Sequence, residues 1–139
     1  MRTLIFIAFL FLALEPVQAE DTPATLPFSK AVRVGNMLYL SGELGTKPGM
    51  VQLVPGGIGP ETQQTMDNIK ATLEANGSEM DHVVKCLVML ADINEWAAMN
   101  AVYRTYFKNR FPARSAMGAN GLALGARVEI ECMAEVVGG

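Results

Sequence analysis

Between positions 127 and 136 the sequence alternates strictly between apolar and mostly polar residues. The apolar set is Val128, Ile130, Cys132, Ala134 and Val136, and the other set is Arg127, Glu129, Glu131, Met133 and Glu135. A period of two is typical of a β-strand with one face in a core and the other face polar. The chain is therefore expected to contain a sheet that other elements cover on one side.

Four further apolar runs predict strands. Residues 31–34 and 37–41 are separated by Gly35-Asn36, and two residues of this type suit a tight hairpin. Residues 83–90 are almost wholly apolar and predict a buried strand, and residues 114–117 predict a short strand before a glycine-rich turn.

Two segments carry apolar residues at helical spacing. The first has Met66, Ile69 and Leu73, and the second has Trp96, Met99, Tyr103 and Phe107. The first helix is expected to start at Pro60, after a glycine-rich loop over residues 42–59, and to end at Asn76-Gly77. The apolar stripe of the second helix is interpreted as core.

The order of these elements is β-β-α-β-α-β-β. It predicts an α+β fold in which a sheet has two helices packed on one face. No internal repeat or linker divides the chain, so a single domain is expected over residues 20–139. A domain on the order of 120 residues can bury an adequate core.

The first nineteen residues have the pattern of a secretory signal peptide. Arg2 gives a basic start, residues 4–14 are an unbroken apolar run, and Val17 and Ala19 place small side chains before the predicted cleavage point. A membrane anchor is the alternative, but eleven helical residues span only about 17 Å of a hydrocarbon core roughly 30 Å thick. The prediction is a signal peptide over residues 1–19 and a periplasmic or secreted protein.

Composition excludes several classes of function. The formal net charge of −3 disfavours nucleic-acid binding, which needs many cations to neutralise phosphates. His82 is the single histidine and there is no Cys-x-x-Cys motif, so neither a metal site nor a Ser-His-Asp triad is expected. Cys86 and Cys132 are interpreted as small core residues, and export would permit a disulfide between them, but the sequence does not show their separation in space.

One stretch of this acidic chain is locally basic. From Trp96 to Val128 there is no Asp or Glu, whereas the basic residues are Arg104, Lys108, Arg110, Arg114 and Arg127. Arg114 follows the rigid Phe111-Pro112-Ala113 and precedes small residues, which suits bidentate capture of a carboxylate or phosphate as well as it suits a structural role. For Glu129, the alternation by itself favours a solvated carboxylate. If another subunit covers this face, Glu129 becomes a buried acid that can act as a general base.

Six blocks of the sequence together resemble one known family. They are PFSKAVRVGNMLYLSG, QTMDNIKATLEANG, DHVVKCLVML, NEWAAMNAVYRTYF, FPARS and VEIECMAEV, which extend from Pro27 to about Glu135. The most specific are FPARS and, about fourteen residues later, VEIE. On these blocks the chain resembles the Rid family of reactive intermediate deaminases, also called the YjgF family.

The resemblance implies a chorismate-mutase-like α+β fold and a homotrimer with clefts between subunits. It implies hydrolysis of small 2-imino or enamine acids, such as 2-iminopropanoate and 2-iminobutanoate, to 2-keto acids and ammonia, without a metal or organic cofactor. The implied partners are a small carboxylate substrate and other copies of the chain, with no nucleic acid and, after signal removal, no membrane. The alternative function is an exported trimer that binds small carboxylates or acts as a holdase-like surface without turnover.

The same resemblance assigns roles to individual residues. Arg114 would clamp the substrate carboxylate and Glu129 would position or activate the attacking water. The implied substrate-binding residues are Phe28, Ser41, Gly42, Asn100, Ser115 and Ala116. Archetypal members have tyrosine at the position of Phe28 and cysteine at that of Ala116, so a more apolar pocket is expected here.

Overall fold

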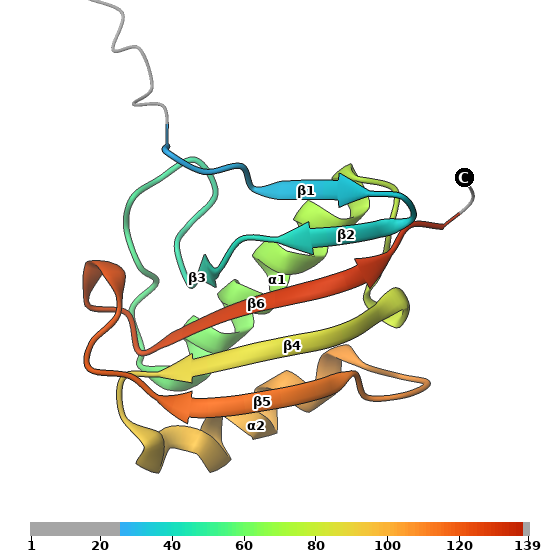
Figure 1. Ribbon diagram of the computed structural model, residues 1–139. Helices are drawn as coiled ribbons and strands as arrows, with labels where there is room; N and C mark the ends of the chain where they lie inside the picture. The colour runs from blue at the N-terminus through green and yellow to red at the C-terminus, as the bar shows by residue number, and fades with distance from the viewer. Residues whose placement is uncertain (1–25, 138–139) are drawn as a thin grey trace, which may run out of the picture.

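The computed structural model describes residues 26–137, so the predicted signal peptide lies outside the described residues. One mixed sheet has both helices on the same face (Figure 1). The strands are β1 (Ala31–Val34), β2 (Met37–Leu40), β3 (Glu43–Leu44), β4 (Val83–Leu90), β5 (Ala113–Gly118) and β6 (Val128–Glu135). The helices are α1 (Ile58–Ala75) and α2 (Trp96–Tyr103). The predicted α+β fold is confirmed, and over the described residues no helix has the length and apolar character needed to cross a bilayer.

The strand order in the sheet is β1-β2-β6-β4-β5, with the short β3 also paired to β6. The pairs are antiparallel except β4 and β5, which run parallel. A parallel pair needs a crossover connection, and α2 lies on it between β4 and β5. This places β5, which carries Arg114, at an edge of the sheet beside α2 (Figure 1).

The core lies between the helices and the sheet face that they cover. From β6 it takes Val128, Ile130, Cys132 and Ala134, as the alternation predicts, and from α1 it takes Met66, Ile69 and Leu73. The opposite face of the sheet has no helix over it within the described residues (Figure 1). We call this second face the open face, and it carries Glu129, Glu131 and Met133 from β6.

Three expectations about the elements are corrected by the structure. The segment 42–59 is not all loop, because Glu43 and Leu44 form β3, a strand too short to show a period in the sequence. Helix α1 begins at Ile58 instead of Pro60; proline is tolerated there because the N–H groups of the first turn have no intrahelical partner. Trp96, expected in the core, is 45% exposed, whereas the remaining stripe of the second helical segment is buried.

The two cysteines form a disulfide between neighbouring strands. Cys86 on β4 and Cys132 on β6 are directly opposite in the antiparallel register, with Cα atoms 4.1 Å apart. Both are 1% exposed, so the expectation that they are core residues is confirmed. The sequence left open whether they bond to each other, and in the structure they do. The disulfide closes a sequence separation of 46 residues in the middle of the sheet.

Candidate active site

Arg114 projects from the edge strand β5 toward α2. Its Nη1 donates a 2.6 Å hydrogen bond to Asn100 Oδ1, and its guanidinium carbon lies 4.8 Å from the ring centroid of Tyr103 and 5.7 Å from that of Trp96. Aromatic faces attract a guanidinium at these distances, and the amide fixes its rotation. Three residues on successive turns of α2, Trp96, Asn100 and Tyr103, therefore orient the Arg114 guanidinium that β5 supplies.

The guanidinium has no acidic partner in the protein. Among residues 26–137, no salt bridge involves Arg114. Burial raises the pKa of the neighbouring Tyr103 to about 12, an effect that the positive charge of Arg114 opposes, so this phenol is neutral at ordinary pH. The remaining donors of Arg114 are thus available to an anion, and a planar fork of donors suits a carboxylate.

A pocket of about 580 Å³ opens beside Arg114. Its walls are mostly apolar and come from α2 and from the segment before β5, with Trp96, Phe111 and Pro112 among them. Asn100, Arg104 and Arg114 contribute the polar groups. A few polar groups in a mostly apolar hollow are typical of small-molecule sites.

Glu129 lies on the open face of β6, half-buried beside Gly42. Burial, and to a smaller extent the negative charge of Glu131, raise the pKa of the Glu129 carboxyl above its ordinary value. A Cβ added to Gly42 would lie 2.1 Å from Glu129 Oε1, so a glycine is needed for the carboxylate to occupy this place. A carboxylate whose pKa is raised is a stronger base than a solvated one.

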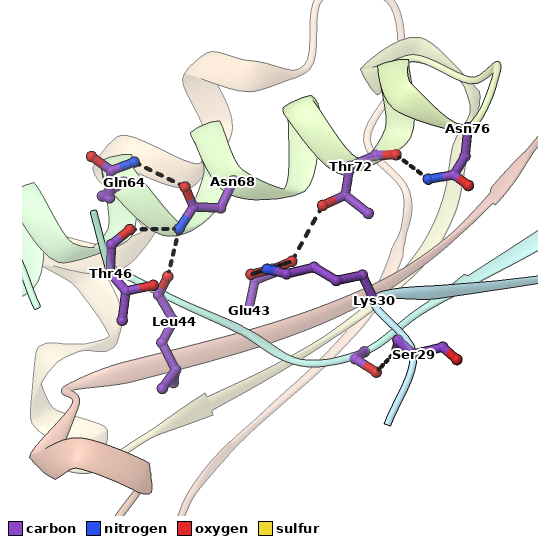
Figure 2. Close-up of polar contacts among 10 residues, drawn as sticks. Ser29, Lys30, Glu43, Leu44, Thr46, Gln64, Asn68, Thr72 and Asn76 are labelled. Carbon is purple, nitrogen blue, oxygen red and sulfur yellow. Dashed lines mark hydrogen bonds and ion pairs between the residues drawn. The ribbon is translucent and has the colours of Figure 1, made fainter. Parts of the chain in front are cut away.

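A buried polar cluster holds the Gly42 segment in position. Glu43 is 5% exposed, its carboxylate accepts bonds from Lys30 Nζ at 3.0 and 3.2 Å, and Thr72 Oγ1 of α1 donates to it at 3.3 Å (Figure 2). Asn68 of α1 donates to the carbonyl oxygens of Leu44 and Thr46, both at 2.9 Å (Figure 2). The strand after Gly42 is therefore tied to α1. Sequence analysis did not find this cluster, because its carboxylate is indistinguishable in sequence from a solvated one.

The other predicted site residues are distributed over the two faces. Ala116 lies on the helix side with Arg114 and packs against the core, whereas Ser115 lies on the open face and accepts a 3.2 Å bond from Lys85 Nζ. Ser41 Oγ donates to the carbonyl of Ser29 at 2.6 Å. Phe28 is exposed and lines, with Gly42, a second hollow of about 690 Å³ beside α1.

Within one chain, Arg114 and Glu129 do not meet. In the register of β5, β4 and β6, Arg114 is in one row with Cys86 and Cys132, which point into the core. Glu129 is in the row of Met89 and Met117, an odd number of positions further along, and so it points to the open face. The predicted site is thus divided into a half with Arg114, Asn100 and Ala116, and a half with Gly42 and Glu129.

The fold and this divided site define a class of protein: a small α+β domain that presents an arginine-lined pocket on one side of its sheet and a basic carboxylate on the other. Over residues 19–136 the chain matches the family model described as Endoribonuclease L-PSP. The chain belongs to this family, which is the family of the YjgF and Rid proteins.

Relatives and solved structures agree with this membership. The chain is 45% identical over 119 residues to "2-iminobutanoate/2-iminopropanoate deaminase" of Capra hircus, covering 85% of this chain and 87% of the relative. It is similar to the crystal structure of RidA from Psychrobacter sp. PAMC 21119, with a TM-score of 0.76 and 37% identity; the match covers 86% of this chain and 97% of that one. It is also similar to the crystal structure of E. coli TdcF with bound serine, with a TM-score of 0.75 and 26% identity; the match covers 81% of this chain and 90% of that one.

Proposed function

We propose that this protein hydrolyses small 2-imino acids to 2-keto acids and ammonia without a cofactor. The observation that carries the proposal is Arg114, a guanidinium oriented by Asn100 in an apolar pocket and without a carboxylate partner in the described part of the chain. Relatives more than 40% identical are named 2-iminobutanoate/2-iminopropanoate deaminases, and a solved relative holds serine, a small amino acid with a carboxylate.

Hydrolysis of a 2-imino acid requires mainly orientation of the substrate and transfer of protons. Arg114 would hold the carboxylate through two parallel hydrogen bonds and so fix the imine carbon. Water adds to that carbon while Glu129 accepts its proton, and the proton then passes to the nitrogen. In the resulting carbinolamine, Glu129 then moves the hydroxyl proton to the amino nitrogen. The carbon–nitrogen bond breaks as the carbonyl forms, which releases ammonia and leaves the keto acid.

The activity is tested by keto-acid release from freshly generated 2-iminopropanoate and 2-iminobutanoate with the purified mature protein. Release above the uncatalysed rate supports the deaminase. Binding of small carboxylates without any release would support the alternative, a binding module with no turnover. Phe28 and Ala116 are the residues to change to tyrosine and cysteine in that case, because these are the departures from the archetypal pocket.

The proposal requires an oligomer, because the two halves of the site lie on opposite faces of one sheet. A neighbouring copy that covers the open face could bring its Arg114 half to Glu129 of the first copy, and closed rings repeat such a contact. The open face carries exposed large apolar side chains, including Val32, Tyr39 and Met117, as expected for a surface that a partner covers. We propose a homotrimer with the active site between subunits.

The trimer gives a direct prediction for the mass in solution. Light scattering should give about three times the mass of the mature chain over a wide dilution range, as a closed ring requires. Met117→Glu, which places a charge on the open face, should dissociate the ring and abolish activity. Lys70→Glu, on the exposed side of α1, should do neither. A stable and active monomer would contradict the divided site.

Export is the remaining part of the proposal, and the disulfide supports it. Cytosolic thiols are kept reduced, whereas the periplasm and the extracellular space allow a disulfide such as Cys86–Cys132 to persist. The signal-peptide pattern at residues 1–19 is an independent observation on the same chain.

We expect protein recovered from the periplasm or the medium to begin at Glu20 and to contain one intramolecular disulfide. Intact-mass measurement before and after reduction and alkylation checks both features. Ala19→Leu should block cleavage, because the last residue before the cleavage site must be small. A chain that still begins at Met1 in the cytosolic fraction, with both thiols free, would contradict export.

A further inference from the structure

Lys30 and Glu43 form an ion pair in which only one partner is exposed. The Lys30 side chain is 64% exposed and the Glu43 side chain 6%, with 3.0 Å between Nζ and Oε1. Thr72 of α1 supplies a second donor to the same oxygen of Glu43 (Figure 2). A buried carboxylate is costly unless a cation and hydrogen bonds compensate it, so Lys30 keeps the Glu43 carboxylate in this place.

The ion pair joins two chain segments that belong to the Glu129 half of the site. One segment carries Phe28 and the other carries Gly42. Between them, Ser41 donates through Oγ to the Ser29 carbonyl at 2.6 Å and through its backbone N–H to the Lys30 carbonyl at 3.0 Å. The ion pair therefore closes a connection that the bonds of Ser41 begin.

Gly42 lies between this ion pair and Glu129. In the register of β3 and β6, Glu43 is opposite the core residue Ile130, so the Glu43 side chain points to the helices, whereas Glu129 points to the open face. The backbone of Gly42 closes on Glu129, since a Cβ added there would lie 2.1 Å from Glu129 Oε1. Glu43 can therefore act on the Glu129 carboxylate only through the position of Gly42.

We infer that Lys30 and Glu43 are positioning residues, whose ion pair holds the Gly42 backbone against Glu129 and so keeps water away from the general base. The inference rests on the proposed function. Neither residue of the pair contacts the substrate.

The basicity of Glu129 is the property that this contact controls. Burial is the main cause of the raised pKa of Glu129, and the negative charge of Glu131 is the smaller cause. The residues paired with Glu129 on β3 and β4 are Leu44 and Met89, which have no charge, and Lys85, the charged residue of β4 on this face, is four residues from Met89. If the ion pair is broken and the backbone moves away, water enters and the pKa of Glu129 falls toward its ordinary value.

The unequal exposure of the two partners predicts unequal effects of replacing them. Lys30→Met leaves a buried carboxylate without a cation, so kcat should fall about 10- to 100-fold, the scale of a misplaced catalytic group, while KM changes by less than about threefold. Glu43→Gln should lower kcat by about threefold or less, because the amide oxygen still accepts bonds from Lys30 and Thr72 and water solvates the exposed ammonium.

The double variant Lys30→Met/Glu43→Gln separates positioning from direct chemistry. It removes the buried charge together with its partner, so kcat should return to within about threefold of that of Glu43→Gln. If Lys30 itself acted on the substrate, the double variant would remain as impaired as Lys30→Met, and this result would overturn the inference. Lys70→Met, in the exposed ion pair of Lys70 with Glu74 on α1, is the matched control and should leave kcat unchanged.

The pH profile distinguishes a displaced backbone from a smaller folded fraction. In Lys30→Met the acid limb of kcat should move to lower pH, whereas a loss of folded protein alone would lower the plateau and leave the limb in place. If Lys30→Met is not recovered as a folded protein, Lys30→Gln, which keeps an uncharged donor, takes its place.

A carbon-13 NMR titration of the Glu129 carboxyl gives a readout that does not depend on turnover. If the wild-type protein hydrolyses no imine, the proposed function fails, and a lower pKa of Glu129 in the Lys30 variant than in the wild type still supports the positioning role. The same pKa of Glu129 in both proteins would overturn the inference, whatever their activity, and would leave the deaminase in place if the imines are hydrolysed.

Discussion

Arg114→Ala should lower kcat/KM for 2-imino acids about 30- to 1000-fold, which corresponds to roughly 2–4 kcal/mol of transition-state stabilisation. The reason is the loss of a charge-assisted, two-point contact to the substrate carboxylate. Arg114→Lys should be almost as impaired, because an ammonium cannot bond to Asn100 Oδ1 and also present a planar fork to the substrate. Steady-state kinetics of keto-acid release measures both variants.

A matched arginine separates this effect from a general loss of charge. Arg33 is exposed on β1, at the opposite edge of the sheet from β5, so Arg33→Ala should keep the wild-type kcat/KM. Light scattering on each variant verifies that the oligomer is intact. If trimeric Arg114→Ala hydrolyses 2-iminopropanoate at the wild-type rate, the carboxylate clamp is wrong.

Glu129→Gln should lower kcat about 10²- to 10⁴-fold, the usual contribution of a positioned general base, and should leave carboxylate binding largely intact. The amide preserves the shape beside Gly42 but cannot accept a proton. Titration with an unreactive carboxylate measures binding, and single-turnover kinetics measures the chemical step. A variant that loses binding but keeps its rate at saturation would show that Glu129 acts in binding instead.

The pH profile provides a second check on Glu129, with Glu131→Gln as its control. A base works when deprotonated, so kcat should fall as the pH drops through the raised pKa of Glu129. Glu131→Gln removes the nearby negative charge that contributes to raising this pKa, so the acid limb should move to lower pH while the plateau rate stays the same. An acid limb that is unaffected by this substitution would exclude the assignment of that limb to Glu129.

The parts of the fold that were predictable from sequence are those in which the spacing of apolar residues shows which side of a strand or helix faces the core. The alternation over residues 127–136 correctly assigned Ile130 and Cys132 to the core and Glu129 to the other face. Arg114 was singled out by its rigid approach and by the absence of nearby acids. Family resemblance then supplied its role, which the residues alone left open.

The remaining features depend on how separate elements lie against one another. Helical spacing shows that Trp96 shares a face with Met99, but it does not show that α2 lies beside the edge strand β5 (Figure 1). In this position the Trp96 side chain is 45% exposed. The disulfide requires that β4 pair with β6 in one particular register. The separation of Arg114 from Glu129 requires two such registers in succession, and neither is encoded by a local pattern.

The placement of Arg114 and Glu129 on opposite faces has a genetic consequence. In the proposed trimer, every active site takes its arginine from one chain and its carboxylate from another. A chain defective only at Arg114 and a chain defective only at Glu129 are each inactive by themselves, yet a mixed ring of the two contains an interface at which both intact residues meet. Two inactive alleles expressed in one cell can therefore complement each other, whereas a chain that carries both substitutions cannot be rescued by either of them.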